Sequence, residues 1–219
     1  MRVLIGCEES QRVTESFRNL GFEAYSNDIM DTSGNHQEWH LKMDLFEAVE
    51  LIKPDCLIAF PPCTYLTVSA NAHYVNNPER WEKRLDAMKF VHKIMNLPIK
   101  HIAIENPVGV ISSHIRKPDQ IIQPWYFGDP EIKKTCLWLK NLPLLQYALE
   151  DDIYNVKTAV EPDYVLYKSK KTKSGFTKYG KITGTNPSTN NPENAKLRSK
   201  TYAGIANAMA LQWGEYILK

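Results

Sequence analysis

The chain has 219 residues, of which 43% are hydrophobic and 24% are charged, a composition typical of a globular protein with one sizeable core. Its formal net charge of +2 excludes a chain that is basic throughout, so any nucleic-acid binding must come from local clusters of positive charge. No apolar run approaches the roughly 18 residues that a membrane-spanning helix needs, and we expect no membrane partner. The four cysteines form no Cys-x-x-Cys pair, which argues against a metal site and favours free thiols in a reducing cytoplasm.

Short apolar runs alternate with helical patterns over the first two-thirds of the chain. Residues 3–5 predict a buried strand rather than a secretory signal, and Ser10 predicts the N-cap of a helix that runs to about Leu20. The elements predicted after it are strands at 22–25 and 39–43, a helix at 45–52, a strand at 56–60, a helix at 78–95 and a strand at 99–104. This alternation is typical of an α/β protein with a doubly wound, mostly parallel sheet.

The character of the chain changes after about residue 143. Residues 168–181 carry six lysines and no acidic residue. Residues 183–194 are polar and rich in Asn, Pro and Thr, which predicts a loop. An amphipathic helix is predicted again at 202–218.

Polar or reactive residues follow each of the five predicted strands. Ligands of open parallel sheets bind beyond the carboxyl ends of the strands, so we expect these residues to share one edge. They are Cys7-Glu8-Glu9-Ser10, Asp28, Asp44, Pro61-Pro62-Cys63 and Glu105-Asn106-Pro107.

Two of these residues have the chemistry of a catalytic pair. Cys63 follows two prolines, which fix two φ angles and hold the thiol stiffly, as a nucleophile requires. The alternative is that Cys63 is a small buried hydrophobe, the usual fate of a free cysteine. Glu105 follows an apolar strand, so partial burial should raise its pKa and let it hold a proton near neutrality. The alternative for Glu105 is a structural carboxylate paired with a lysine.

Pro-Pro-Cys, followed by Glu-Asn-Pro on the next strand, resembles the DNA cytosine-C5 methyltransferases, and most closely their short phage and prophage branch. The resemblance extends over residues 3–28, 59–67, 102–109, 118–143 and 198–214. It implies a Rossmann-like fold of the S-adenosylmethionine-dependent methyltransferase type. It also implies a catalytic domain at 1–148, a small irregular recognition segment at 149–197 and a C-terminal helix at 198–219 that packs back on the catalytic domain.

The resemblance implies that Cys63 attacks C6 of cytosine while protonated Glu105 holds the base at N3 and at the exocyclic amine. Carbon C5 then takes a methyl group from S-adenosylmethionine. Pro62 and Asn106 belong to the same implied catalytic set, Asn106 by shaping the turn that carries the carboxyl group. A target base in a DNA duplex must leave the stack to reach the thiol, and residues 64–77 would form a loop that closes over it.

The implied cofactor is S-adenosylmethionine, held at its methionine end by the backbone of the first loop. Asp28 would accept hydrogen bonds from the ribose hydroxyls, and Asp44 would face the adenine amine. The alternatives are a turn carboxylate for Asp28 and a helix N-cap for Asp44. The predicted cofactor-binding residues are Ile5, Gly6, Cys7, Glu8, Ser10, Asp28, Asp44 and Pro61, and no metal is expected.

Nucleic-acid contacts would come from lysines that neutralise phosphates, with Phe176 or Tyr179 stacking on bases; the alternative is a solvated basic loop. Compared with the larger enzymes of the family, the first loop is acidic instead of glycine-rich, lysines stand where arginines are usual, and the recognition segment is small. The predicted nucleic-acid-binding residues are Lys133, Lys134, Lys170, Lys171, Lys173 and Lys178.

The leading prediction is therefore methylation of cytosine in double-stranded DNA, in the cytoplasm of a bacterial host. Protection of phage DNA from restriction is the role that the resemblance implies. The first alternative is the same chemistry on RNA or on a free cytosine nucleotide. The second is a methyltransferase-like binding protein without turnover. An N-methyltransferase ranks lower, because those enzymes place an aromatic residue after Pro-Pro, where this chain has Cys63.

Overall fold

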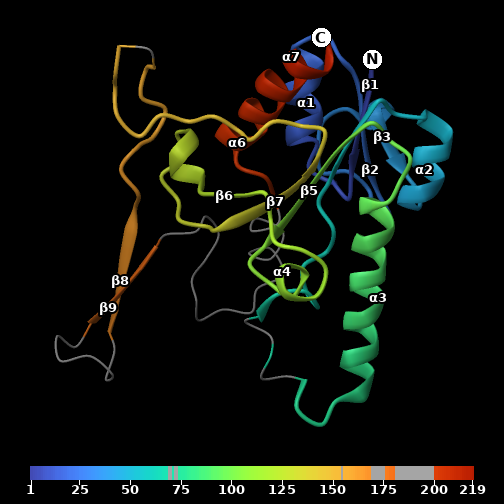
Figure 1. Cartoon of the computed structure of the whole chain (residues 1–219), viewed down its shortest axis with the longest axis horizontal. Helices are drawn as coiled ribbons and strands as arrows, with labels where there is room; N and C mark the ends of the chain where they lie inside the picture. The colour runs from blue at the N-terminus through green and yellow to red at the C-terminus, as the bar shows by residue number, and fades with distance from the viewer. Residues whose placement is uncertain (69–70, 72–73, 154, 169–175, 181–199) are drawn as a thin grey trace.

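The structure, a computed structural model, describes residues 1–68, 71, 74–153, 155–168, 176–180 and 200–219 (Figure 1). Its strands within these ranges are β1 Arg2–Gly6, β2 Glu23–Asp28, β3 His40–Lys42, β4 Cys56–Ala59, β5 His101–Pro107, β6 Gln120–Ile122, β7 Thr135–Lys140, β8 Tyr164–Lys168 and β9 Phe176–Gly180. Its helices are α1 Arg12–Asn19, α2 Leu45–Ile52, α3 Pro78–Met95, α4 Ile111–His114, α6 Ala203–Ala208 and α7 Gly214–Ile217. A π-helical turn, Met209–Trp213, joins α6 to α7.

The main sheet has the strand order β3-β2-β1-β4-β5-β7-β6. The first five strands in this order run parallel, whereas β7 runs antiparallel to both of its neighbours. The chain leaves β1 toward one side of the sheet and crosses to β4 on the other, so the sheet is doubly wound. The predicted fold class, an α/β protein with a mostly parallel doubly wound sheet, is confirmed.

Each face of the sheet is covered by helices that come from different parts of the chain. Val3 and Ile5 of β1 pack in one core with α1, α6 and α7, whereas Leu4 packs in a second core with α2 and α3. This division follows from the two-residue period of a strand. All four residues of β4 are fully buried, which explains why its sequence is continuously apolar. Figure 1 shows α1, α6 and α7 gathered together and α3 extending away from the sheet on the other side.

The helix boundaries follow local capping signals in two cases and a distant residue in a third. Helices α2 and α3 have the predicted bounds, because Asp44 accepts the Phe46 amide and Asn77 accepts the Arg80 amide at their first turns. The prediction that Ser10 caps α1 is wrong. The helix starts at Arg12, and its first amides are capped by the side chain of Glu8 instead.

Other element boundaries differ from the predicted ones because they depend on pairing between strands that are distant in sequence. Strand β5 does not end at residue 104 but continues to Pro107, because residues 105–107 pair with β7. The sequence patterns did not identify β6, β7 or the β8–β9 pair, and this pair lies within the segment predicted at 149–197. The helix predicted at 202–218 contains a π-helical turn.

Among the described residues, no helix combines the length and apolarity needed to cross a membrane.

Candidate functional site

A buried hydrogen bond joins the two segments that were predicted to be catalytic. Asn106 at the end of β5 donates from Nδ2 to the carbonyl oxygen of Pro61 at 2.7 Å, and Asn106 is only 1% exposed. The same two segments meet again further along, where the Val110 amide donates to the Leu66 carbonyl at 2.8 Å. The loop that carries Cys63 therefore lies directly against the end of the strand that carries Glu105.

Cys63 is exposed at this edge, in contrast to Cys56 and Cys136, which are buried. Its backbone is held in a closed turn, since its carbonyl oxygen accepts the amides of Leu66 at 2.9 Å and Thr67 at 3.1 Å. The alternative in which Cys63 is a buried hydrophobe is wrong. An exposed thiol on a rigid turn is accessible to a substrate and can act as a nucleophile.

Glu105 lies on β5 beside the first residues of β7. Burial raises the pKa of the Glu105 carboxyl group, while the charge of Lys133 and a hydrogen bond from the Thr135 side chain lower it without reversing the shift. The sequence left two interpretations of Glu105: a carboxyl group with a raised pKa, or a carboxylate paired with a lysine. The structure has features of both, since the carboxyl group has Lys133 nearby and still has a raised pKa. Burial, and then the charge of the Glu105 carboxyl group, raise the pKa of the Cys136 thiol to about 11.

Glu8 in the first loop turns toward α1. Its carboxyl oxygens accept the Val13 amide at 2.7 Å, the Thr14 amide at 3.2 Å and the Thr14 hydroxyl at 2.7 Å, and the residue is 4% exposed. Its own amide donates to Asn27 at 2.9 Å. Burial raises the pKa of Glu8 to about 7, against the lowering effect of these hydrogen bonds. The Glu8 carboxyl group is thus used by α1, and the cofactor contacts predicted for the other residues of this loop stay a prediction.

Three of the other predicted cofactor residues do come together. Burial, then the charges of Asp28 and Asp44, raise the pKa of the Cys7 thiol to about 12, so both carboxylates lie near the end of β1. Asp28 accepts the Met30 amide at 3.0 Å, and Asp44 accepts the Phe46 amide at 2.8 Å. The turn and N-cap roles are thus present, and each uses one oxygen of its carboxylate. Gly6 and Ile5 are buried beside them, Ser10 and Cys7 are half-buried, and Pro61 is buried in the next loop.

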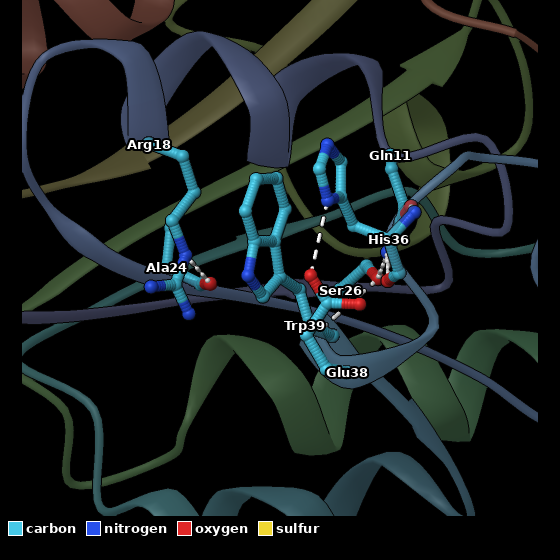
Figure 2. Close-up of polar contacts among 7 residues, drawn as sticks. All are labelled: Gln11, Arg18, Ala24, Ser26, His36, Glu38 and Trp39. Atoms are coloured by element: carbon cyan, nitrogen blue, oxygen red, sulfur yellow. Dashed lines mark hydrogen bonds and ion pairs between the residues drawn. The ribbon is translucent and has the colours of Figure 1, made fainter.

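Sequence reasoning missed the residues that hold the loop after β2 against the loop after β1. Gln11 binds the backbone of His36 from both ends of its amide, donating to the His36 carbonyl at 2.6 Å and accepting the His36 amide at 3.1 Å. Figure 2 shows this pair beside Trp39, whose ring stacks on His36 at a centroid distance of 3.5 Å. Gln11 is fully buried, and because its partner lies 25 residues further along the chain, no local pattern in the sequence indicated this contact. These contacts bring the two loops that flank Asp28 together.

The lysines predicted to bind nucleic acid are placed in different ways. Lys133 lies near Glu105, with its Nζ 5.9 Å from the centre of the Tyr202 ring, and Lys134 is exposed beside it. Lys178 belongs to β9, which forms a separate two-stranded pair with β8. Lys170, Lys171 and Lys173 lie outside the described residues.

The strand order, with antiparallel β7 between β5 and β6 and helices on both faces, is that of a Rossmann-like α/β fold. No family model matches the chain, and no curated protein matches it. Among solved structures, the Entamoeba histolytica methyltransferase EhMeth is similar with 15% identity and a TM-score of 0.47, covering 75% of this chain and 58% of that one.

Two further similar structures are Dnmt2-type proteins. The S. pombe Dnmt2 methyltransferase has 17% identity and a TM-score of 0.43, covering 66% of this chain and 51% of that one. A Spodoptera frugiperda DNMT2 triple mutant has 14% identity and a TM-score of 0.39, covering 65% and 52%. The chain thus spans a little over half the length of each structure. Identities this low transfer no residue roles, so the function rests on this chain's own residues.

Proposed function

We propose that this chain is an S-adenosylmethionine-dependent cytosine-C5 methyltransferase that acts on double-stranded DNA. The observation that carries the proposal is the hydrogen bond between Asn106 and Pro61, which ties the turn of an exposed thiol to the strand of a desolvated carboxyl group. A thiol is a strong nucleophile once ionised, and a carboxyl group with a raised pKa keeps a proton to donate. Attack on C6 of a pyrimidine needs both groups.

The proposed chemistry begins when the Cys63 thiolate forms a bond to C6. The electron pair of the C5–C6 double bond shifts to form a C4–C5 double bond, and the electron pair of the C4–N3 double bond takes the proton that Glu105 passes to N3. This hydrogen bond strengthens as negative charge develops, so it lowers the barrier and not merely the dissociation constant. S-adenosylmethionine, when bound, would supply an electrophilic methyl group to C5, and the pair of the broken S–CH3 bond would stay on its sulfur, leaving the thioether S-adenosylhomocysteine. A base then removes the C5 proton, the double bond re-forms, Cys63 leaves as the thiolate, and the N3 proton returns to Glu105.

The residues around Cys7 fit this cofactor. S-adenosylmethionine carries a sulfonium charge, an amino group and ribose hydroxyls, and carboxylates attract or accept all of these. Asp28 and Asp44 both act on the Cys7 thiol, so they gather negative charge at the end of β1. Each also has a second carboxylate oxygen besides the one that binds its own loop. Asp28 is proposed to bind the ribose, and Asp44 the adenine amine.

The DNA substrate is proposed from the placement of positive charge. Lys133 and Lys134 precede β7 at the same edge as Glu105, where they could neutralise phosphates flanking an extruded base. The β8–β9 pair, which carries Lys178, projects away from the main sheet in Figure 1, and we assign it to the same contact surface. A phage or prophage origin and protection of DNA from restriction belong to this proposal.

The test uses S-adenosylmethionine with a labelled methyl group and separate duplex DNA, RNA and deoxycytidine nucleotides. The expected result is label at C5 of cytosine in duplex DNA, and no transfer by Cys63→Ser that retains the wild-type melting temperature. Label only in RNA or only in the nucleotide pool would keep the chemistry and overturn the DNA substrate. No label in any pool, from folded protein that binds the cofactor, would favour a binding protein without turnover.

A further inference from the structure

The guanidinium group of Arg84 is buried against the loop that follows Cys63. Arg84 is 4% exposed although it belongs to α3, whose neighbouring residues are largely in solvent. Its Nε donates to the Tyr65 carbonyl at 2.8 Å, and its Nη2 donates to the Asn71 side chain at 2.9 Å and the Thr67 carbonyl at 3.4 Å. Within the described ranges, no carboxylate lies within ion-pair distance of Arg84.

Aromatic rings complete the surroundings of this charge. The guanidinium carbon lies 3.6 Å from the centre of the Tyr74 ring and 5.3 Å from that of Trp81. Tyr74 in turn donates its hydroxyl to the Tyr65 carbonyl at 3.0 Å, the oxygen that also accepts from Arg84. A buried charge is costly unless it is hydrogen-bonded, and arginine suits this place because its planar group can bond carbonyls and stack on a ring together.

The backbone carbonyls that accept hydrogen bonds from Arg84 belong to the turn that carries the Cys63 thiol. Tyr65 and Thr67 lie two and four residues after Cys63, and the Thr67 amide donates to the Cys63 carbonyl. The other side of this turn is fixed to the segment that follows β5, through the bond from the Val110 amide to the Leu66 carbonyl. The turn is therefore held between α3 on one side and the strand of Glu105 on the other.

We propose that Arg84 is a positioning residue that holds the Cys63 turn in the orientation the reaction needs. The proposal rests on the proposed function, in which Cys63 is the nucleophile. Arg84 touches neither the base nor the cofactor in this account, and it acts through the carbonyls of Tyr65 and Thr67. A small displacement of a nucleophile lowers the reaction rate more than it lowers binding of a cofactor at another part of the site.

The experiment compares wild type with Arg84→Ala, Arg84→Lys and the control Lys89→Ala, an exposed residue of the same helix. Steady-state methyl transfer should show kcat lowered about 10- to 100-fold in both Arg84 variants, with an unchanged KM for S-adenosylmethionine. Guanidinium ion at low, non-denaturing concentration should restore part of kcat in Arg84→Ala, because it fits the space left and meets the same carbonyls. Sodium chloride at equal concentration should not, and Lys89→Ala should behave as wild type.

A second readout does not depend on methyl transfer. The rate of Cys63 alkylation by iodoacetamide, followed by peptide mass, should change severalfold in both Arg84 variants, and in Arg84→Ala it should return toward wild type with guanidinium. If the Arg84 variants lose thermal stability but keep the wild-type alkylation rate and the wild-type kcat, the positioning role is overturned. If wild type transfers no methyl group, the proposed function fails, and the alkylation rates still decide whether Arg84 sets the environment of Cys63.

Discussion

Replacement of Glu8 by glutamine should make the protein more stable at pH 8 and leave it nearly unchanged near pH 4.5. The carboxyl group is fully buried, and burial raises its pKa from 4.5 to about 7. Below pH 4.5 the group is protonated in both the folded and the unfolded chain. As the pH rises toward 7, the unfolded chain loses this proton first, so the folded state loses stability over that window.

The magnitude follows from the size of the shift. One unit of pKa corresponds to about 1.4 kcal/mol, so a rise from 4.5 to about 7 removes about 3 kcal/mol of unfolding free energy by pH 8. Glutamine imitates a carboxyl group protonated on Oε2: its oxygen accepts the Val13 amide, its NH2 group donates to the Thr14 hydroxyl, which turns to accept, and the Thr14 amide loses its acceptor in both cases. Glu8→Gln carries no proton to lose, so this part of the pH dependence should vanish.

Urea unfolding followed by tryptophan fluorescence, repeated between pH 4.5 and 8, measures the effect. The difference in unfolding free energy between Glu8→Gln and wild type should grow by about 3 kcal/mol in favour of the variant. Glu50→Gln, at an exposed position of α2, is the control and should follow the wild-type curve. A variant less stable than wild type at pH 8 would refute the reasoning. It would mean that the amides of α1 hold Glu8 as a charged N-cap despite burial.

Three further predictions concern the edge of the sheet. Asn106→Ala leaves the buried Pro61 carbonyl without its donor and should lower the unfolding free energy by about 1 to 3 kcal/mol in urea titrations, whereas a loss near zero would show the tie to be unimportant. Glu105→Gln should lower kcat by about 100-fold and remove the decline in rate that wild type shows as pH rises through the raised pKa of Glu105. Retention of that decline in a pH-rate profile would assign it to another group. Gly109→Ala should reduce kcat with little change in the KM of the cofactor, because a Cβ there would clash with the backbone oxygen of Leu66 and displace the Cys63 loop. Wild-type kinetics in this variant would contradict the coupling.

The parts of the fold that could be read from the sequence are those with local causes. Helices α2 and α3 begin at capping residues next to them in sequence, and β4 is apolar because both of its faces are covered. The boundaries that were wrong depend on distant partners. Strand β5 extends to Pro107 only because β7 pairs with it, and α1 begins late because Glu8 folds back onto its first amides.

The candidate site divides in the same way. The order of Cys63 and Glu105 along the chain, each near the end of a buried strand, was enough to predict that they share an edge. The hydrogen bond from Asn106 to Pro61 joins residues 45 positions apart, and the hydrogen bond from Arg84 to Tyr65 joins residues 19 positions apart. No local pattern in the sequence encodes either bond. The two contacts of Gln11 with His36 are of the same kind.

The most direct measurement is a covalent trap with a DNA duplex that contains 5-fluorocytosine. Fluorine at C5 cannot leave as a proton does, so the bond between Cys63 and C6 should persist after methyl transfer. With S-adenosylmethionine present, wild type should form a complex that survives denaturing electrophoresis and maps to the peptide that contains Cys63, and Cys63→Ser should form none. A folded, cofactor-binding wild type without any complex, or an adduct that persists in Cys63→Ser, would contradict the assignment of Cys63 as nucleophile.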